Sequence, residues 1–183
     1  MVVGFGFWIF LLSDIILFSA LFATYAVLRD ATAGGPVAQA LFSLPSVAVE
    51  TVCLLVSSFT CGLAMLAARR GAVGLTQIFL GLTGVLGAVF LGLELREFGE
   101  LIGRGAGPER SAFLSSFFTL VGCHGLHVAV GLLWLGTMMA QVATRRFQPN
   151  ILRRLMCFSL FWHALDIVWV AVFTIVYLMG ATR

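Results

Sequence analysis

The chain has 183 residues, of which 61% are hydrophobic and 10% charged, and its mean hydropathy is +1.07. Soluble domains are about half apolar and about a quarter charged, so this composition excludes a soluble globular protein. The formal net charge of +3 is too small to indicate nucleic-acid binding. A bilayer-crossing helix takes about 20 residues, so five or six crossings would use the whole chain. We therefore expect an all-α, polytopic membrane protein.

Five apolar stretches have the length that a bilayer requires, and their continuous apolar character favours helices over the alternating strands of a barrel. In chain order they cover residues 5–28, 45–68, 75–95, 113–143 and 155–179. Charged residues, glycine and proline separate them, with the tightest connection at Arg69-Arg70-Gly71 and the last one from Arg145 to Arg154. The sequence thus predicts one transmembrane domain over residues 1–183, a bundle of five helices.

The distribution of arginine predicts how the chain lies in the membrane. An odd number of crossings places the two termini on opposite sides. Of the eleven arginines, six lie in loops on the side of the N-terminus and five on the other side, where they are mixed with acidic residues. Under the positive-inside rule this pattern favours a cytoplasmic N-terminus and an external C-terminus.

Ionisable side chains at membrane depth are the main candidates for function. Asp14 lies in the first stretch, His124 and His127 in the fourth, and His163 and Asp166 in the fifth. A carboxylate at the bilayer centre costs about 2.5–3.5 kcal/mol on insertion scales, so such residues face the bundle interior and pair. We expect these five to converge in one buried network. Asp166 would pair with His163 or His127, and Asp14 with a hydroxyl or imidazole.

Two interpretations of this network remain open. The histidines fit neutral, hydrogen-bonded side chains that join helices. Imidazole and carboxylate groups also suit iron or zinc, but His-Glu-x-x-His is absent and the spacing fixes no further ligands. We therefore predict no metal site. For Asp14, a structural carboxylate and a proton relay are both compatible with the sequence.

Three more carboxylates lie nearer the ends of the apolar stretches: Glu50, Glu94 and Glu97. Glu94 and Glu97 close the third stretch beside charged neighbours, which predicts a solvated interfacial face more than a site. The chain has no phosphate-binding glycine loop, and no loop is long enough to build a catalytic pocket. We predict no catalytic residues.

Tryptophan and glycine indicate how the helices pack. Trp162 and Trp169 are seven residues apart, so they share one helix face, and a buried indole N–H needs a hydrogen-bond partner. Small residues recur between Gly81 and Gly92 and between Gly122 and Ala129. Such stripes allow helix backbones to approach closely, which indicates packing and not chemistry.

Several strings carry a family resemblance. Residues 113–128, with Val-Gly-Cys-His-Gly-Leu-His-Val at their end, resemble the central signature of subunit III of haem–copper respiratory oxidases. Residues 160–169, Leu-Phe-Trp-His-Ala-Leu-Asp-Ile-Val-Trp, are similar to the last-helix motif of that family, and Phe-Leu-Leu-Ser-Asp at 10–14 to its first common helix. The loop residues 32–36 and 107–111 and the ending at 176–180 look most like the five-helix branch found in bacterial cytochrome o ubiquinol oxidases.

The resemblance implies an accessory subunit of a proton-pumping terminal oxidase that oxidises ubiquinol and reduces O2 to water in the bacterial inner membrane. Family members bind no haem or copper, which reside in the large subunit I. They pack against that subunit and other oxidase subunits, hold phospholipid, and stabilise the complex and its proton or oxygen supply. Whether the isolated chain is an enzyme stays open. The alternative is a small proton-coupled transporter or channel that uses the Asp/His network.

Overall fold

The computed structural model describes residues 2–34 and 44–181, and it contains no strand in this part of the chain. Five helices are long and apolar enough to cross a membrane, which confirms the predicted all-α class. The elements are α1 (Val2–Leu28), α3 (Leu44–Arg69), α4 (Val73–Gly103), α5 (Ala112–Arg145), α6 (Pro149–Val172), a π-helical turn η1 (Phe173–Leu178) and α7 (Met179–Ala181).

Helices α4 and α6 extend furthest beyond the apolar stretches that predicted them. Helix α4 continues to Gly103, and α6 begins at Pro149 instead of at Leu155, so the predicted loop from Arg145 to Arg154 is wrong. Hydropathy marks where a helix meets lipid, whereas its ends depend on local chemistry. Pro149 suits the first turn of α6 because proline lacks an N–H, and the first N–H groups of a helix have no intrahelical acceptor.

Glycines in the left-handed conformation end two of the helices. Gly71 follows α3 with φ +72°, and Gly105 follows α4 with φ +73°. In both turns the next amide reaches back five residues, from Ala72 to Ala67 O at 3.1 Å and from Ala106 to Leu101 O at 2.9 Å. This is the Schellman arrangement, which satisfies carbonyl groups at a helix end.

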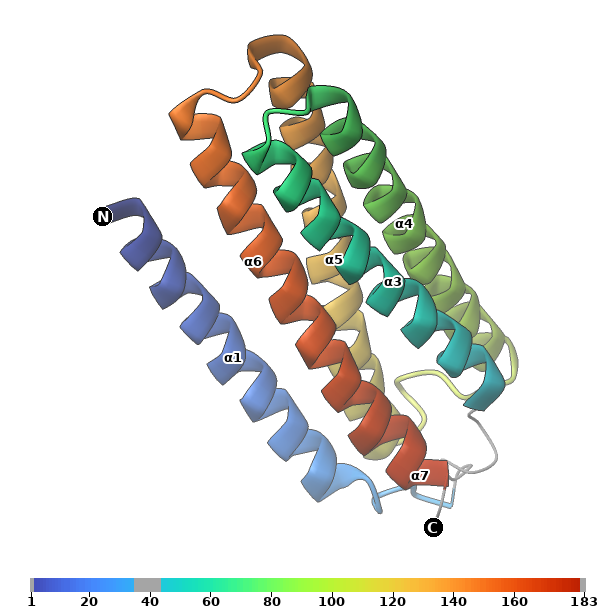
Figure 1. Cartoon of the computed structure of the whole chain (residues 1–183). Coiled ribbons are helices and arrows are strands. Elements are labelled where there is room, and N and C mark those ends of the chain that lie inside the picture. Colours follow the sequence, from blue (N-terminus) through green and yellow to red (C-terminus); the bar gives the residue numbers. More distant parts are fainter. Residues whose placement is uncertain (1, 35–43, 182–183) are drawn as a thin grey trace.

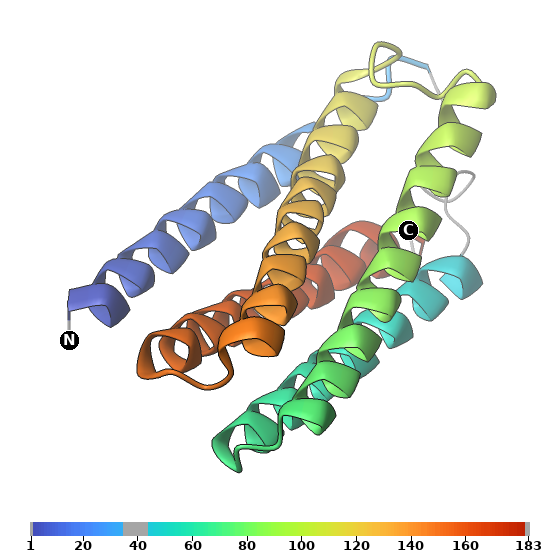
Figure 2. The ribbon, with the colours of Figure 1, turned by 90° about the horizontal axis from the view of Figure 1, so that it is seen from above.

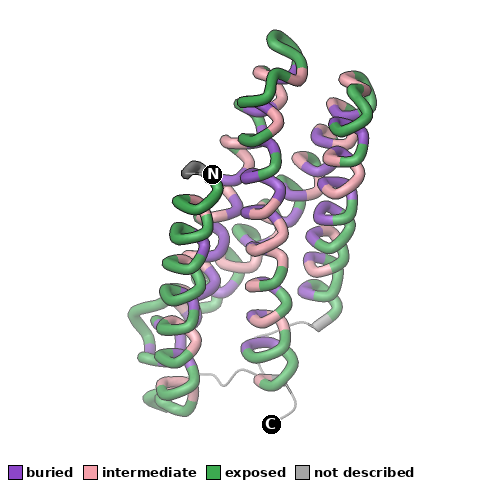
Figure 3. The backbone as a smooth tube through the Cα atoms, turned by 60° about the vertical axis from the view of Figure 1, so that its left-hand side comes forward, coloured by how far each residue is buried: buried purple, intermediate pink, exposed green. Residues whose placement is uncertain are grey.

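Helices α3, α4, α5 and α6 form a four-helix bundle, and α1 lies outside it against α5 and α6. Figures 1 and 2 show α1 at one edge of the molecule and α4 at the other. The buried side chains of α1 are Leu11, Phe18 and Tyr25, seven residues apart. This narrow stripe, which we call the α1 seam, attaches a helix whose other faces are exposed (Figure 3).

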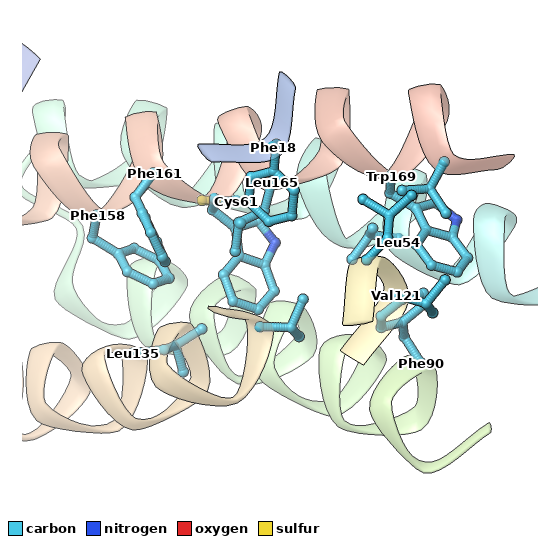
Figure 4. Packing of buried hydrophobic residues seen from close by; sticks show 14 of the residues in the cluster. Phe18, Leu54, Cys61, Phe90, Val121, Leu135, Phe158, Phe161, Leu165 and Trp169 are labelled. Carbon is cyan, nitrogen blue, oxygen red and sulfur yellow. The ribbon is translucent and has the colours of Figure 1, made fainter. Parts of the chain in front are cut away.

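The core of the bundle is densely aromatic, as the close view in Figure 4 shows. Trp162 of α6 lies at its centre and is 1% exposed. A Cβ atom added to Gly87 of α4 or to Gly131 of α5 would come within 2.9 Å of its ring. The indole therefore packs directly against the backbones of two helices, which explains why glycine occupies both positions.

Candidate polar sites in the bundle

The structure brings Asp14 and His127 together across the α1–α5 contact. His127 Nε2 lies 3.7 Å from Asp14 Oδ1, and each side chain is about one-fifth exposed. His127 Nδ1 donates to the carbonyl oxygen of Cys123 at 2.7 Å. The ring of Phe18, in the α1 seam, packs on His127 with centroids 5.2 Å apart. Of the two partners predicted for Asp14, a hydroxyl or an imidazole on a neighbouring helix, the structure places an imidazole beside it.

The hydrogen bond to Cys123 fixes how the ring of His127 is turned. A carbonyl oxygen only accepts, so Nδ1 of His127 carries a hydrogen and Nε2 is the ring nitrogen nearest the Asp14 carboxyl group. At 3.7 Å this contact is longer than a hydrogen bond, and it joins α1 to α5 at membrane depth.

A second polar group lies between α3 and α6. Ser58 Oγ and His163 Nδ1 form a hydrogen bond of 2.6 Å. Asp166 follows His163 by one helical turn and interacts with it electrostatically. The Asp166 Oδ1 atom is buried and has no hydrogen-bond partner among the described residues. All three side chains line one open groove on the outside of the bundle.

His124 lies apart from both pairs, inside the aromatic core. Its side chain is fully buried, and neither ring nitrogen has a hydrogen-bond partner among the described residues. Its ring centroid is 5.2 Å from that of Trp169, 5.8 Å from that of Phe90 and 6.3 Å from that of Phe18. Rings from α6, α4 and α1 thus enclose this imidazole, unlike the hydrogen-bonded histidine that we expected.

The five predicted network residues are accordingly divided. Asp14 with His127 lies at the α1–α5 contact, His163 with Asp166 faces the α3–α6 groove, and His124 lies between them among aromatic rings. The two histidines of the fourth span share a helix, but only one of them contacts a carboxylate. Sequence spacing placed each residue on the correct helix and did not specify which neighbouring helix it faces.

A cluster of carboxylate side chains lies between α3, α4 and η1. Glu50 and Glu94 are each 2% exposed, so the predicted solvated face is wrong for Glu94. One oxygen of each, Oε2, has no hydrogen-bond partner in the described part of the chain. Glu97 accepts a hydrogen bond of 3.0 Å from the hydroxyl of Tyr177. Glu94 fits because its neighbour on α5 is Gly125, where an added Cβ would lie 2.6 Å from Oε1.

Hydroxyl groups of α3 accept hydrogen bonds from the N–H groups of the two indoles. The sequence did not single out these hydroxyls. Trp162 Nε1 donates to Ser57 Oγ at 2.9 Å, and Trp169 Nε1 donates to Thr51 Oγ1 at 3.1 Å. Both tryptophans are buried, as their shared face predicted. The signal for these partners was the run of serine and threonine within an otherwise apolar span.

A metal or haem would need ligands that converge and are free to coordinate. Within residues 2–34 and 44–181, no three His, Cys, Asp or Glu side chains form a group that could bind a metal ion. His127 and His163 lie at two different helix contacts, and aromatic rings surround His124.

Five membrane-length helices with polar side chains paired between them define the class, a polytopic helical membrane protein. The sequence profile of the family described as "Cytochrome c oxidase subunit III" matches residues 2–181, and the chain belongs to this family.

Named relatives include subunits of both quinol and cytochrome c oxidases. The chain is 60% identical over 177 residues to "Cytochrome bo(3) ubiquinol oxidase subunit 3" of Pseudomonas aeruginosa, which covers 97% of this chain and 85% of the relative. It is 46% identical to "Quinol oxidase subunit 3" of Bacillus subtilis, covering 96% and 86%. It is 47% identical to "Cytochrome c oxidase subunit 3" of Bacillus sp., covering 96% and 84%.

Proposed function

We propose that this chain is the accessory subunit 3 of a terminal ubiquinol oxidase that reduces O2 to water. The observation that carries the proposal is the 60% identity, over 97% of this chain, to a relative named as subunit 3 of a ubiquinol oxidase. A relative named for cytochrome c is less similar, at 47%. We therefore assign ubiquinol as the electron donor of the complex.

The haem and copper of the complex belong, in this proposal, to the large subunit I. The histidines of this chain support that division because they contact protein groups or aromatic rings and do not converge. The chain contributes packing surface, lipid contacts and a fixed environment beside the catalytic subunit. Its own residues carry out no redox step.

The Asp14–His127 pair supports a role in proton or oxygen supply. It joins α1 to α5 at membrane depth, where few buried contacts fix the α1 helix. Without this contact α1 would be held mainly by the apolar α1 seam. We propose that the pair keeps α1 in place during turnover. It would thereby preserve the path by which protons or oxygen reach the catalytic subunit.

The arrangement in the membrane follows from charge. The start of α1, the α3–α4 turn and the α5–α6 turn lie at one end of the bundle, and the η1–α7 end lies at the other (Figure 1). The first end carries six of the eleven arginines. We propose that this end faces the cytoplasm of a bacterial cell, that the C-terminus is periplasmic and that the membrane is the inner membrane.

The test is a purification of the tagged chain in mild detergent, with reduced-minus-oxidised spectra before and after it is stripped to a single subunit. Haem that copurifies with a large partner, and leaves with it, is the expected result. Oxidation of ubiquinol, and not of cytochrome c, by the intact complex would support the assigned donor. Haem that stays on the stripped chain would contradict the proposal and make His124, His127 or His163 a ligand.

A further inference from the structure

Three glutamates of α4 become steadily more exposed toward the C-terminal end of the helix. Glu94, Glu97 and Glu100 are three residues apart, so consecutive side chains are neighbours on the helix surface. Glu94 is 2% exposed, Glu97 is half-buried, and the side chain of Glu100 is 49% exposed. Each carboxyl group interacts electrostatically with the next. These three residues, which we call the α4 carboxylate row, lead from the interior of the bundle to its surface.

The two ends of the α4 carboxylate row differ in the cations beside them. At the exposed end, Glu100 accepts a hydrogen bond of 2.9 Å from Arg96 Nε, and Arg104 Nη2 lies 3.9 Å from its other oxygen. None of the ion pairs formed by the described residues includes Glu94 or Glu50. A carboxylate beside a cation is stable as an ion, whereas an unpaired carboxyl group away from water takes up a proton and becomes neutral.

Glu50 of α3 meets the buried end of the row. Its side chain is 2% exposed and interacts electrostatically with Glu94 and Glu97. The Oε2 atoms of Glu50 and Glu94 are buried and have no hydrogen-bond partner among the described residues. Two ionised carboxylates in this place would repel each other and would lack a donor. A proton on one of them removes the repulsion and supplies an O–H donor.

The groups that face this site from the other helices are aromatic or uncharged. Helix α5 meets Glu94 with Gly125, and the residue before it, His124, lies among aromatic rings. From η1, the hydroxyl group of Tyr177 donates to Glu97 at 3.0 Å. Helix α6 contributes Trp169, whose ring centroid lies 6.2 Å from that of Tyr177. These groups leave the negative charge of the carboxyl groups to be neutralised by protons.

We propose that Glu50 and Glu94 form a proton-binding site, which exchanges protons along Glu97 and Glu100 with water at the end of the bundle where α7 lies (Figure 1). At neutral pH at least one of the two buried groups is a neutral carboxylic acid. A proton taken from water by the Glu100 carboxylate passes to Glu97 and then to Glu94. Each donor returns to a carboxylate as the next group is protonated, so no redox step is involved. The site goes beyond the proposed function and does not rest on it.

The binding site is tested by infrared spectroscopy of the protein purified with its native partners. Parent-minus-variant spectra for Glu50→Gln and Glu94→Gln should contain the carbonyl band of a protonated carboxyl group, which shifts in D2O. Glutamine keeps the size of the side chain and cannot give this band. The matched control is Glu109→Gln, in the exposed loop after α4, whose difference spectrum should lack the band at neutral pH.

The exchange route is tested by moving the protein into D2O and timing the shift of this band. Glu97→Gln should slow the shift about a hundredfold, the lower end of what a positioned acid or base contributes to proton transfer. Glutamine still offers an oxygen to the hydroxyl group of Tyr177, so the local structure is kept. Glu97→Asp, which retains a carboxyl group, should restore most of the rate. Glu109→Gln should leave the rate unchanged.

Two results would overturn the inference. A carboxyl band that is absent from both difference spectra, Glu50→Gln and Glu94→Gln, would show that neither residue holds a proton at neutral pH. A band that shifts equally fast in the parent and in Glu97→Gln would show that protons do not travel along the α4 carboxylate row. The thermal midpoint of each variant identifies loss of fold. Because the two buried residues are tested separately, the site stays testable if one variant does not fold.

Discussion

Helices α1 and α6 both cross the membrane and both carry an aspartate near a histidine, yet the bundle holds them differently. In the most apolar part of α1, 11% of the residues are buried. In the most apolar part of the last span, which is mainly α6, 50% are buried. Helix α6 packs Trp162 against two helix backbones and anchors its indoles on α3. Helix α1 is held by the narrow α1 seam and by the Asp14–His127 contact.

This contrast predicts that the polar contacts of α6 are needed for assembly, whereas the Asp14–His127 contact affects turnover. Regions with few buried contacts open at low free energy, whereas a packed core opens only with the whole fold. Changes around α6 should therefore prevent the chain from folding or assembling. Changes at Asp14 should leave assembly intact and alter how long the complex works.

The largest effect is expected from Gly131→Leu, which forces a side chain into the ring of Trp162. An added Cβ would already lie 2.9 Å from that ring, and overpacking of a core costs about 1–3 kcal/mol or more. The thermal midpoint of the purified complex should fall, and less of the chain should assemble. Gly136→Leu is the control on the same helix, because nothing lies within 4 Å of its added Cβ. Equal losses in the two variants would refute this role of Trp162.

An intermediate effect is expected from Gly125→Ala, which places a methyl group 2.6 Å from Glu94 Oε1. The buried carboxylate must shift, at a cost of about 1–2 kcal/mol in unfolding free energy. Shortening the partner with Glu94→Ala should restore much of that loss, so the two changes should be non-additive. Thermal unfolding of the single and double variants measures the coupling.

The control for this pair is Gly122→Ala, whose added Cβ meets Phe98 at an ordinary 3.6 Å. It should change the thermal midpoint little. Strictly additive effects of Gly125→Ala and Glu94→Ala would show that the two residues do not constrain each other.

The smallest effect on stability is expected from Asp14→Asn. An amide keeps the size of the side chain, so assembly and haem spectra should stay close to those of the parent. The active lifetime during continuous ubiquinol oxidation should shorten, because the substitution removes the carboxyl group that faces His127 across the α1–α5 contact. Oxygen uptake followed until inactivation measures this. An unchanged lifetime at matched assembly would leave Asp14 a purely structural residue.

Much of this architecture could be predicted from the sequence. The five spans follow from hydropathy, and the expectation that Asp14 has a polar partner on a neighbouring helix, a hydroxyl or an imidazole, follows from the cost of a carboxylate in lipid. The start of α6 at Pro149 was missed because helix ends depend on capping chemistry, which hydropathy does not report.

The candidate sites were less predictable. The burial of Glu94 was missed because its position depends on Gly125, a glycine that the sequence indicated only as packing. The partner of His163, Ser58, could not be chosen because several hydroxyls of α3 lie on different faces. Spacing identifies the face of one helix, whereas contacts between helices depend on rotation about both axes.

The accessory role is best tested by comparing the ubiquinol oxidase with and without this chain, at equal amounts of the large subunit. We predict that the complex lacking the chain keeps its haem spectra and its initial rate of oxygen uptake but loses activity sooner during turnover. Loss of a haem signal on removal of this chain alone would contradict the assignment of an accessory subunit without cofactors.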